Sequence, residues 1–250
     1  MTFYAAGELM HDDMKKSIAI MQPYVFPYVG YFSLIESVDV FVFYDDVNYI
    51  KNGWINKNRI LLNGEPHKFT IPVSNASQNF LICDIDIHDF DEFKRKFKSK
   101  ISHAYKKSPY YDIGSKYIDA VFENVEGKNI ANLAISSVVT LYDFLNKKEK
   151  KFLRSSELKE NFFVSKREER LINIVKNLGA SRYINAIGGA EIYSKEYFLQ
   201  HGVELCFLNP KFLNYKQTHN NFISGLSIID VLMFNSLDSV NKIINTYEVI

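Results

Sequence analysis

The sequence is poor in the residues that define several common classes of protein. Its 250 residues include two cysteines, Cys83 and Cys206, which lie far apart and in no spacing typical of zinc ligands. We therefore expect neither a disulfide framework nor a structural zinc site. Only 11 glycines and 6 prolines are present, which argues against a collagen-like or linker-dominated chain. Because we also find no secretory signal at the start, we expect a globular, cytoplasmic protein.

Excess charge and long apolar runs are lacking as well. Lysine and arginine together number 30 and aspartate and glutamate 29, so the formal charge of +1 predicts no overall attraction to nucleic acid or to an anionic membrane. No apolar run approaches the roughly 20 residues that a transmembrane helix needs. We therefore expect no nucleic-acid partner and no transmembrane segment, and any anion site must be built locally.

Aromatic residues, in contrast, are abundant. The chain contains 20 phenylalanines, 16 tyrosines and a single tryptophan. Such a composition suits a protein whose rings line a sugar or base pocket, and it equally suits a core packed with aromatic side chains. Hydrophobic residues make up 47% of the chain, enough for one large domain or for a core with a smaller companion.

The order of apolar segments predicts an α/β fold with a mostly parallel sheet. A buried strand over 18–21 ends in the proline-containing loop 22–28, a short helix begins at Gly30, and a second strand follows over 40–44. A strand, a helix and a strand in this order form a right-handed crossover of a parallel sheet. The last third of the chain predicts a second such unit, with strands ending near 154, 185 and 208 and helices capped by Ser165 with Glu168 and by Ser227 with Asp230.

A β-hairpin and three helices are predicted between these two units. Asn63-Gly64 stands between two alternating runs and is a preferred pair for a type I′ turn. A strand is expected over 81–87. Helical spacing of apolar residues then predicts helices over 90–101, 110–121 and 130–145. The first of these helices is rich in lysine, which fits either a solvated face or contact with a membrane surface or phosphate-bearing lipid.

These elements divide the chain into four predicted parts. Residues 1–13 show no apolar period and form an extension outside the fold. Residues 14–89 make an N-terminal α/β unit with the hairpin, residues 90–148 a helical insertion, and residues 149–250 the C-terminal α/β part of the same fold.

Polar residues gather where the first two predicted strands end. Gln22 follows the first strand, and Asp45 and Asp46 follow the second. Because parallel sheets bind ligands at the carboxyl ends of their strands, we expect the ligand between the loop 22–31 and this carboxylate pair. The two carboxylates would hold a metal, orient sugar hydroxyls or supply a base there. As a turn pair or a helix cap they would be purely structural.

Three further segments carry candidate binding groups. Lys51, Trp54, Asn56 and Arg59 form a polar and aromatic cluster that suits a charged sugar or a phosphate, although Arg59 on a hairpin also fits a surface cation. Gly188-Gly189 follows a strand, so its backbone N–H groups either cradle an anion or form a plain turn. Gln217 and His219 stand in an irregular polar segment, where a neutral imidazole could take a proton near pH 7 or serve the structure alone.

Several runs of the sequence together carry a family resemblance: 20–32, 44–46, 49–51, 53–60, 154–157, 183–185, 188–189, 215–217 and 226–230. In this order they closely resemble the WbqC-like family, over residues 14 to about 235. Proteins of this family occur in gene clusters for O-antigen and other surface polysaccharides. The resemblance therefore implies a cytoplasmic role in sugar modification. It indicates the pathway but does not identify the reaction.

The opening of the chain is also similar to that of nucleotidyltransferases with a His-x-Gly-His motif. Tyr28 and Tyr31 would take the places of the two histidines, on either side of Gly30. In that superfamily the histidines and a helix N-terminus hold phosphates. Tyrosine can donate a hydrogen bond but carries no positive charge. The replacement is therefore more compatible with binding of a nucleotide or sugar phosphate than with nucleotidyl transfer. The residues 27–30 equally fit a tight turn between strand and helix.

The favoured function is a transferase that modifies a nucleotide-linked amino sugar by acyl or aminoacyl transfer, with His219 or Asp45 as the base. Nucleotidyl transfer and a non-catalytic binding subunit remain open. The sequence identifies no cofactor and no metal ligand set and leaves metal dependence open, and it is compatible with a homo-oligomer. The residues expected to contact the nucleotide-linked sugar or sugar phosphate are Gln22, Tyr28, Gly30, Tyr31, Asp46, Tyr49, Lys51, Trp54, Asn56, Arg59, Asn185, Gly188, Gly189 and Gln217.

Overall fold

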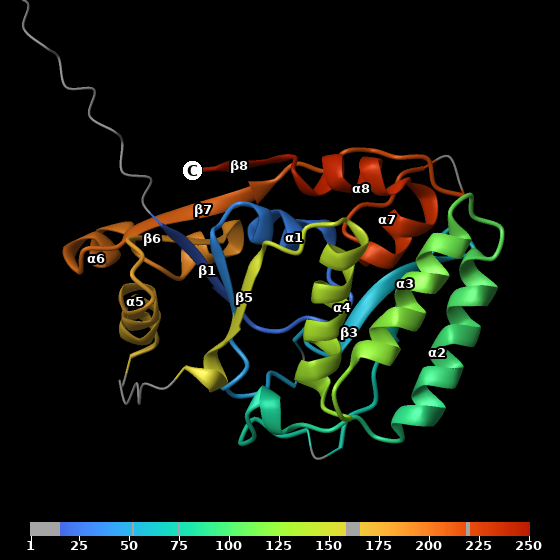
Figure 1. The fold of residues 1–250 in the computed structure, drawn as a ribbon, viewed down its shortest axis with the longest axis horizontal. Coiled ribbons are helices and arrows are strands. Elements are labelled where there is room, and N and C mark those ends of the chain that lie inside the picture. The colour runs from blue at the N-terminus through green and yellow to red at the C-terminus, as the bar shows by residue number, and fades with distance from the viewer. Residues whose placement is uncertain (1–15, 52, 75, 159–165, 219–220) are drawn as a thin grey trace, which may run out of the picture.

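A six-stranded sheet forms the centre of the computed structural model, which describes residues 16–51, 53–74, 76–158, 166–218 and 221–250. Neighbouring strands pair in parallel except for the last, which is antiparallel. This is the mostly parallel α/β sheet that the sequence predicts (Figure 1). In spatial order the strands are β5 (Lys151–Arg154), β2 (Val40–Phe43), β1 (Ser17–Met21), β6 (Arg182–Ala186), β7 (Glu204–Pro210) and β8 (Tyr247–Val249).

The strand order reverses at β1. Numbered along the chain, the sheet strands stand in the order 3-2-1-4-5-6, which is the order of doubly wound nucleotide-binding folds. The chain runs from β1 outward to β2 and β5, and then returns to the other side of β1 for β6 and β7. Open sheets of this kind bind ligands in the crevice outside the carboxyl ends at the reversal, so β1 and β6 mark the expected site.

Helices cover both faces of the sheet because alternate strand residues point to opposite sides. One face buries Ala19 and Phe41 in a core shared with α1 (Val29–Glu36), α7 (Ile228–Phe234) and α8 (Leu237–Ile244). The other face buries Ile18 and Val40 against α5 (Arg167–Asn177) and α6 (Lys195–Gln200). The buried apolar runs that predicted the strands are therefore buried from both sides.

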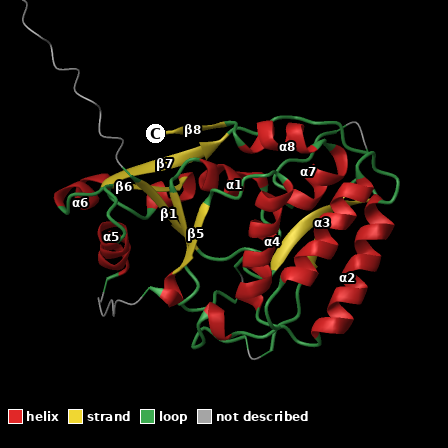
Figure 2. Ribbon diagram, viewed as in Figure 1, coloured by secondary structure: helices red, strands yellow, loops and turns green. Residues whose placement is uncertain are grey.

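The β-hairpin and the three central helices are confirmed and lie beside the main sheet (Figure 2). Strands β3 (Lys57–Leu62) and β4 (Glu65–Thr70) are joined by Asn63 and Gly64, whose φ angles of 51° and 82° are those that the turn requires. Aromatic contacts such as Phe69 with Phe97, 5.1 Å between ring centres, join the hairpin to the helices. The helices are α2 (Phe90–Tyr105), α3 (Tyr111–Asn124) and α4 (Ile130–Phe144).

Two local predictions differ from the structure. The segment 81–87 is not a strand, because its residues make isolated bridges to three separate partners, Asn48, Asn129 and Val73, around a 3-10 turn at Ile82–Asp84. Asp230 does not cap α7, since its carboxylate accepts hydrogen bonds from distant side chains, whereas the Ser227 hydroxyl does cap that helix. The capping residue predicted at 165 lies outside the described residues.

No helix in the described part of the chain is long and apolar enough to cross a membrane. Helices α2 to α4 are inserted between β2 and β5, and the strands of the sheet come from both ends of the chain. The proposed division at 89 and 148 remains a prediction, and residues 1–13 lie outside the described residues.

Candidate functional site

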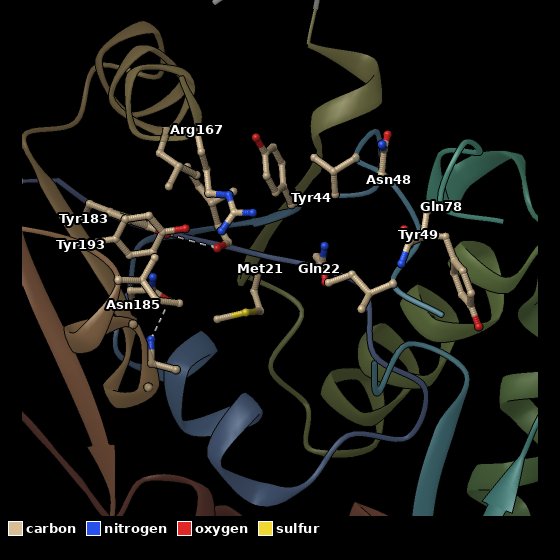
Figure 3. A pocket seen from close by; sticks show the side chains of 18 residues that line it. Met21, Gln22, Tyr44, Asn48, Tyr49, Gln78, Arg167, Tyr183, Asn185 and Tyr193 are labelled. Carbon is tan, nitrogen blue, oxygen red and sulfur yellow. Dashed lines mark hydrogen bonds between the residues drawn. The ribbon is translucent and has the colours of Figure 1, made fainter. Parts of the chain in front are cut away.

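A cleft of about 1060 Å³ opens at the carboxyl ends of β1, β2 and β6 (Figure 3). Gln22 directly follows β1, Tyr44 directly follows β2, and Asn185 stands near the end of β6. The cleft is thus at the reversal of strand order, where a doubly wound sheet binds its ligand. Its volume slightly exceeds the roughly 300–1,000 Å³ common for small-molecule sites.

The lining of the cleft is rich in groups that donate hydrogen bonds. Arg167, the first residue of α5, extends toward the middle of the cleft (Figure 3) and is the only charged residue among the described residues that line it. Four amide side chains line the walls, from Gln22, Asn48, Gln78 and Asn185. Amides both donate and accept hydrogen bonds, whereas a guanidinium only donates them. The described lining therefore favours an anionic ligand with hydroxyl groups.

Four tyrosines complete the polar lining. Burial raises the pKa of Tyr44, Tyr49, Tyr183 and Tyr193 above the ordinary tyrosine value. At Tyr193 the neighbouring Arg167 guanidinium opposes this rise by a hydrogen bond and by its charge. Because a raised pKa keeps the phenol protonated at neutral pH, the hydroxyls of Tyr44 and Tyr193 are available as donors, and all four rings supply apolar walls. The hydroxyls of Tyr49 and Tyr183 donate to protein oxygens, Asn56 Oδ1 and the Ile20 carbonyl.

The Asn185 amide depends on a glycine next to it. Its Oδ1 accepts from the backbone N–H of Ala186 at 2.8 Å, which leaves the Nδ2 group directed toward Gly189. A Cβ atom at Gly189 would lie 2.7 Å from that nitrogen, whereas a Cβ at Gly188 would meet nothing within 4 Å. Gly189 thus makes room for Asn185, and Gly188 faces open space at the edge of the cleft.

The carboxylates Asp45 and Asp46 are occupied by protein groups. Asp45 is fully buried and pairs with Arg154 at 2.8 Å, while its oxygens also accept from the hydroxyls of Ser155 and Ser156 and from the Ser156 backbone. Asp46 pairs with Arg170 on α5 and accepts from Ser155. Neither aspartate lines the cleft. Their contacts tie the end of β2 to the end of β5 and to α5.

This clamp also supports the cleft wall. The Arg170 guanidinium that binds Asp46 lies 4.8 Å from the centre of the Tyr44 ring. Arg170 is one helical turn from Arg167, so fixing Arg170 fixes the start of α5 and with it the cation of the cleft. Asp46 therefore acts on the cleft through Arg170.

Hydrogen bonds with buried side chains fix the loop after β1. Phe26 has a φ of 43°, unusual for a residue other than glycine, and its backbone is bound by the hydroxyls of Ser137 and Ser227 at 2.9 and 2.8 Å. Tyr31 is buried, and its hydroxyl donates to the Gln22 carbonyl at 3.0 Å. Tyr31 thus supports the cleft from the protein interior.

Tyr28 and Gly30 belong to the other end of this loop. The Tyr28 ring stands 6.3 Å from that of Phe212, and a Cβ at Gly30 would lie 2.5 Å from the Tyr28 ring. Gly30 is therefore required for close packing of Tyr28 over the start of α1. Neither of the two residues lines the cleft.

The predicted site residues of the segment 51–59 lie in three different environments. Lys51 is exposed, and its carbonyl accepts from Lys57 at 3.3 Å. Asn56 is buried, where it accepts from the Tyr49 hydroxyl at 2.9 Å and so fixes that cleft residue. Trp54 and Arg59 stack on each other beside the cleft, with 5.7 Å between the guanidinium and the ring centre.

Gln217 lies in the interior, away from the cleft. Its amide donates to Asp230 at 2.8 Å and to the carbonyl of Ile223 at 3.1 Å. Burial raises the pKa of Asp230, and three donors, from Tyr215, Gln217 and Tyr105, oppose the rise. His219 lies outside the described residues. Among the described residues, no three histidine, cysteine, aspartate or glutamate side chains come together as a metal site would require.

The structure therefore divides the predicted site residues into groups. Five line the cleft together: Gln22, Tyr49, Asn185, Gly188 and Gly189. Four others, Tyr31, Asn56, Asp45 and Asp46, support it from behind. Tyr28, Trp54 and Arg59 belong to a neighbouring aromatic surface, Gly30 makes room for Tyr28, and Lys51 and Gln217 stand apart.

Several cleft residues were missed by sequence reasoning. Tyr44 could have been found, because it precedes Asp45 at a strand end. Arg167 and Tyr193 come from α5 and from the turn after β6, and their approach depends on how those segments pack against the sheet. Gln78 is brought near Tyr49 by a hydrogen bond from the Tyr49 N–H to the carbonyl of residue 80, which no local pattern predicts.

Comparisons with known proteins give one curated relative and one family match. An uncharacterized protein of Mycobacterium tuberculosis (strain ATCC 25618 / H37Rv), Rv1507c, is 22% identical over 224 residues, which cover 88% of this chain and 94% of that protein. No solved structure shows significant similarity. The model of the WbqC-like protein family matches residues 22–242, which include every described residue of the cleft except Ile20 and Met21. The chain therefore belongs to the WbqC-like protein family.

Proposed function

We propose that the cleft binds a nucleotide-linked amino sugar and that the protein transfers an acyl or aminoacyl group to that sugar. The observation that carries this proposal is the lining, which combines one arginine, four amides and four tyrosines with no described carboxylate. A diphosphate needs a cation and N–H donors, and sugar hydroxyls need groups that both donate and accept. Aromatic walls suit the flat faces of a base and of a sugar.

The cleft residues divide these tasks by position. Arg167, at the first turn of α5, binds the diphosphate, and the helix dipole adds to its attraction. Gln22 and Asn185, at the reversal of strand order, bind the sugar hydroxyls. The rings of Tyr44 and Tyr193 lie beside Arg167 and cover the remaining apolar surface.

The transfer also requires a base. As the sugar amine attacks the acyl carbonyl and the leaving group departs, a proton must be taken from the amine nitrogen. Asp45 is fully buried and already accepts four hydrogen bonds, which favours a structural role. We therefore propose His219 as the base on its residue type alone, because a neutral imidazole suits this step near pH 7.

Membership of the family supports a proposal for the pathway. WbqC-like proteins occur in gene clusters for surface polysaccharides, so we place the reaction in the synthesis of O-antigen or a related polymer, and in the cytoplasm. Two free cysteines, Cys83 and Cys206, suit that reducing compartment.

A non-catalytic binding subunit is the second candidate. It is favoured by one observation: the described cleft residues include no histidine, carboxylate, cysteine or lysine that could act as base or nucleophile. Nucleotidyl transfer is less favoured, because Tyr28 and Tyr31, which would replace the motif histidines, do not line the cleft.

Binding is tested by calorimetric titration with a panel of nucleotide sugars. We expect at least one to bind, and we expect Arg167→Gln to weaken its binding at least tenfold, which corresponds to about 1.4 kcal/mol. Arg95→Gln, an exposed arginine on α2 paired with Glu92, is the matched control and should bind as the wild type does. Equal binding by Arg167→Gln and the wild type would contradict the proposal.

Turnover separates the two candidates. The wild type and His219→Ala are incubated with the bound nucleotide sugar and with acyl-CoA or amino acid and ATP, and products are read by mass spectrometry. An acylated sugar formed by the wild type and lost in His219→Ala supports transfer. Binding without product under every donor supports the binding subunit.

A further inference from the structure

A second group of aromatic and cationic side chains lies next to the cleft. Tyr24 in the loop after β1 stands 6.2 Å from the ring of Trp54, and the Arg59 guanidinium of β3 stacks on that ring at 5.7 Å. Trp54 is 49% exposed, so one part of its ring faces solvent. Tyr28 joins this group through Ser227, whose backbone bridges to Tyr28 and whose N–H donates to the Arg59 carbonyl at 2.9 Å. We call Tyr24, Tyr28, Trp54 and Arg59 the arginine–aromatic cluster.

Arg59 has unused hydrogen-bonding capacity. Its Nη2 donates to the Gly225 carbonyl at 3.1 Å, and its Nε is buried without a hydrogen-bond partner among the described residues. No described carboxylate lies within 4.0 Å of the guanidinium, whereas the part-buried guanidiniums of Arg154 and Arg170 each pair with an aspartate. A buried donor without a partner costs free energy, and a bound acceptor would remove that cost.

The chain makes room for this arginine. Gly225 has a φ of 67°, and a Cβ atom there would lie 3.3 Å from Nη2 of Arg59. A larger residue would therefore be strained and would crowd the guanidinium. The position of Arg59 is thus built by two segments far apart in the sequence.

Two phenols complete the cluster. The hydroxyls of Tyr24 and Tyr28 make no hydrogen bond within the described part of the chain, and both side chains are half-buried. Burial raises the pKa of both, and at Tyr24 the charge of Arg59 opposes the rise. Tyr24 and Arg59 both lie against the Trp54 ring. Protonated phenols beside a cation supply further hydrogen-bond donors.

We propose that the arginine–aromatic cluster is a second ligand site that binds an oxyanion, a carboxylate or a phosphate, carried on a sugar ring. The guanidinium and the phenol hydroxyls bind the oxyanion, and the exposed part of Trp54 supports the ring. A cationic ligand is disfavoured, because the cluster carries a guanidinium and no described carboxylate lies within 4.0 Å of it.

The site borders the cleft. Gln22 lines the cleft and Tyr24 stands two residues later, so their Cα atoms lie within about 7 Å. Tyr31 joins them, because its hydroxyl binds the Gln22 carbonyl and its ring stands 6.1 Å from that of Tyr24. If the cleft binds the nucleotide-linked sugar, as proposed above, the oxyanion belongs to the second substrate, and this part of the inference rests on that proposed function.

Tryptophan fluorescence reads this site directly, because Trp54 is the single tryptophan of the chain. Full-length protein is titrated with glucuronate, glucose 6-phosphate, inorganic phosphate and neutral glucose. We expect a saturable change with glucuronate or with glucose 6-phosphate, and at least tenfold weaker binding of glucose. The arms with glucuronate and glucose 6-phosphate show which oxyanion is preferred, and inorganic phosphate shows whether the ring contributes.

Variants assign the signal to the cluster. We expect Arg59→Gln to weaken binding of the oxyanion at least tenfold and Tyr24→Phe to weaken it about threefold. Each variant is checked for an unchanged circular dichroism spectrum. Arg95→Gln should behave as the wild type. No saturable change with any anion, equal binding of glucose, or wild-type binding by Arg59→Gln would overturn the site.

A parallel titration with a nucleotide sugar keeps the two proposals distinguishable. Arg59→Gln should leave the affinity of the cleft within about twofold of the wild type, while Arg167→Gln should leave the Trp54 response to the oxyanion unchanged. Oxyanion binding that depends on Arg59, without any nucleotide-sugar binding, would refute the proposed function and keep the site. The reverse result would refute the site alone.

Discussion

Replacing Asp45 by asparagine separates a structural carboxylate from a catalytic one. Asp45 is fully buried, and its oxygens accept from Arg154 at 2.8 Å, from the Ser156 hydroxyl at 2.9 Å and backbone at 3.0 Å, and from the Ser155 hydroxyl at 3.2 Å. An asparagine keeps the shape but presents an NH₂ group to two of these donors. It also leaves the Arg154 cation without its partner.

The expected cost follows from these contacts. A broken buried ion pair costs about 3–5 kcal/mol, and because the Arg154 side chain is 27% exposed we expect about 3 kcal/mol. For a chain of this size each kcal/mol lowers Tm by roughly 2–4 °C, so Tm should fall by about 6–12 °C. The affinity of the folded protein for a nucleotide sugar should stay within about twofold of the wild type.

The assay is thermal unfolding followed by circular dichroism, with calorimetric titration well below Tm. Asp91→Asn is the matched control, because Asp91 is 82% exposed and pairs with Lys128 at 3.2 Å, and its loss should change the unfolding free energy by no more than about 0.5 kcal/mol. A wild-type Tm combined with lost binding or turnover in Asp45→Asn would refute the structural role and restore Asp45 as a functional group.

Three further outcomes test other parts of the account. Gly64→Val should cost about 1 kcal/mol or more of unfolding free energy in urea denaturation, because φ is 82° there, and should leave ligand affinity of the folded fraction unchanged. Gly189→Ala should weaken nucleotide-sugar binding about fivefold in calorimetry, because its Cβ would lie 2.7 Å from Asn185 Nδ2; unchanged affinity would remove Asn185 from the site. Burial raises the pKa of Asp230 above its ordinary value of 3.8, so the folded state keeps the proton of this carboxyl to a higher pH than the unfolded state does. The stability that the bound proton contributes is therefore lost as the pH rises above about 4. The unfolding free energy of the wild type relative to Asp230→Asn should therefore fall over that range, and a constant difference would contradict the burial argument.

The central part of the fold was predictable because it depends on local patterns. Fully apolar runs such as 40–43 identify strands buried on both faces. Asn63-Gly64 identifies the turn because both residue types tolerate the positive φ angles that the structure shows there. Strand β8 gave no such signal, since its three residues pair only with the end of β7. The segment 81–87 carries strand-like residues, but tertiary contacts with three partners decide its path.

The candidate site was predictable where it depends on topology alone. Gln22 and Asn185 follow parallel strands, and the rule for carboxyl ends brings them together. The role of Asp45 was left open, because sequence cannot show that Arg154, more than one hundred residues later, pairs with it. For the same reason the sequence does not identify Arg167 as the cation of the cleft and favours Arg59 as the residue that binds the phosphate.

A crystal structure of the protein with the best-binding nucleotide sugar tests the central claim most directly. We predict the diphosphate at Arg167 and the sugar between Gln22 and Asn185, at the carboxyl ends of β1 and β6. A ligand bound more than about 10 Å from both strand ends, beyond the reach of any of these side chains, would contradict the account.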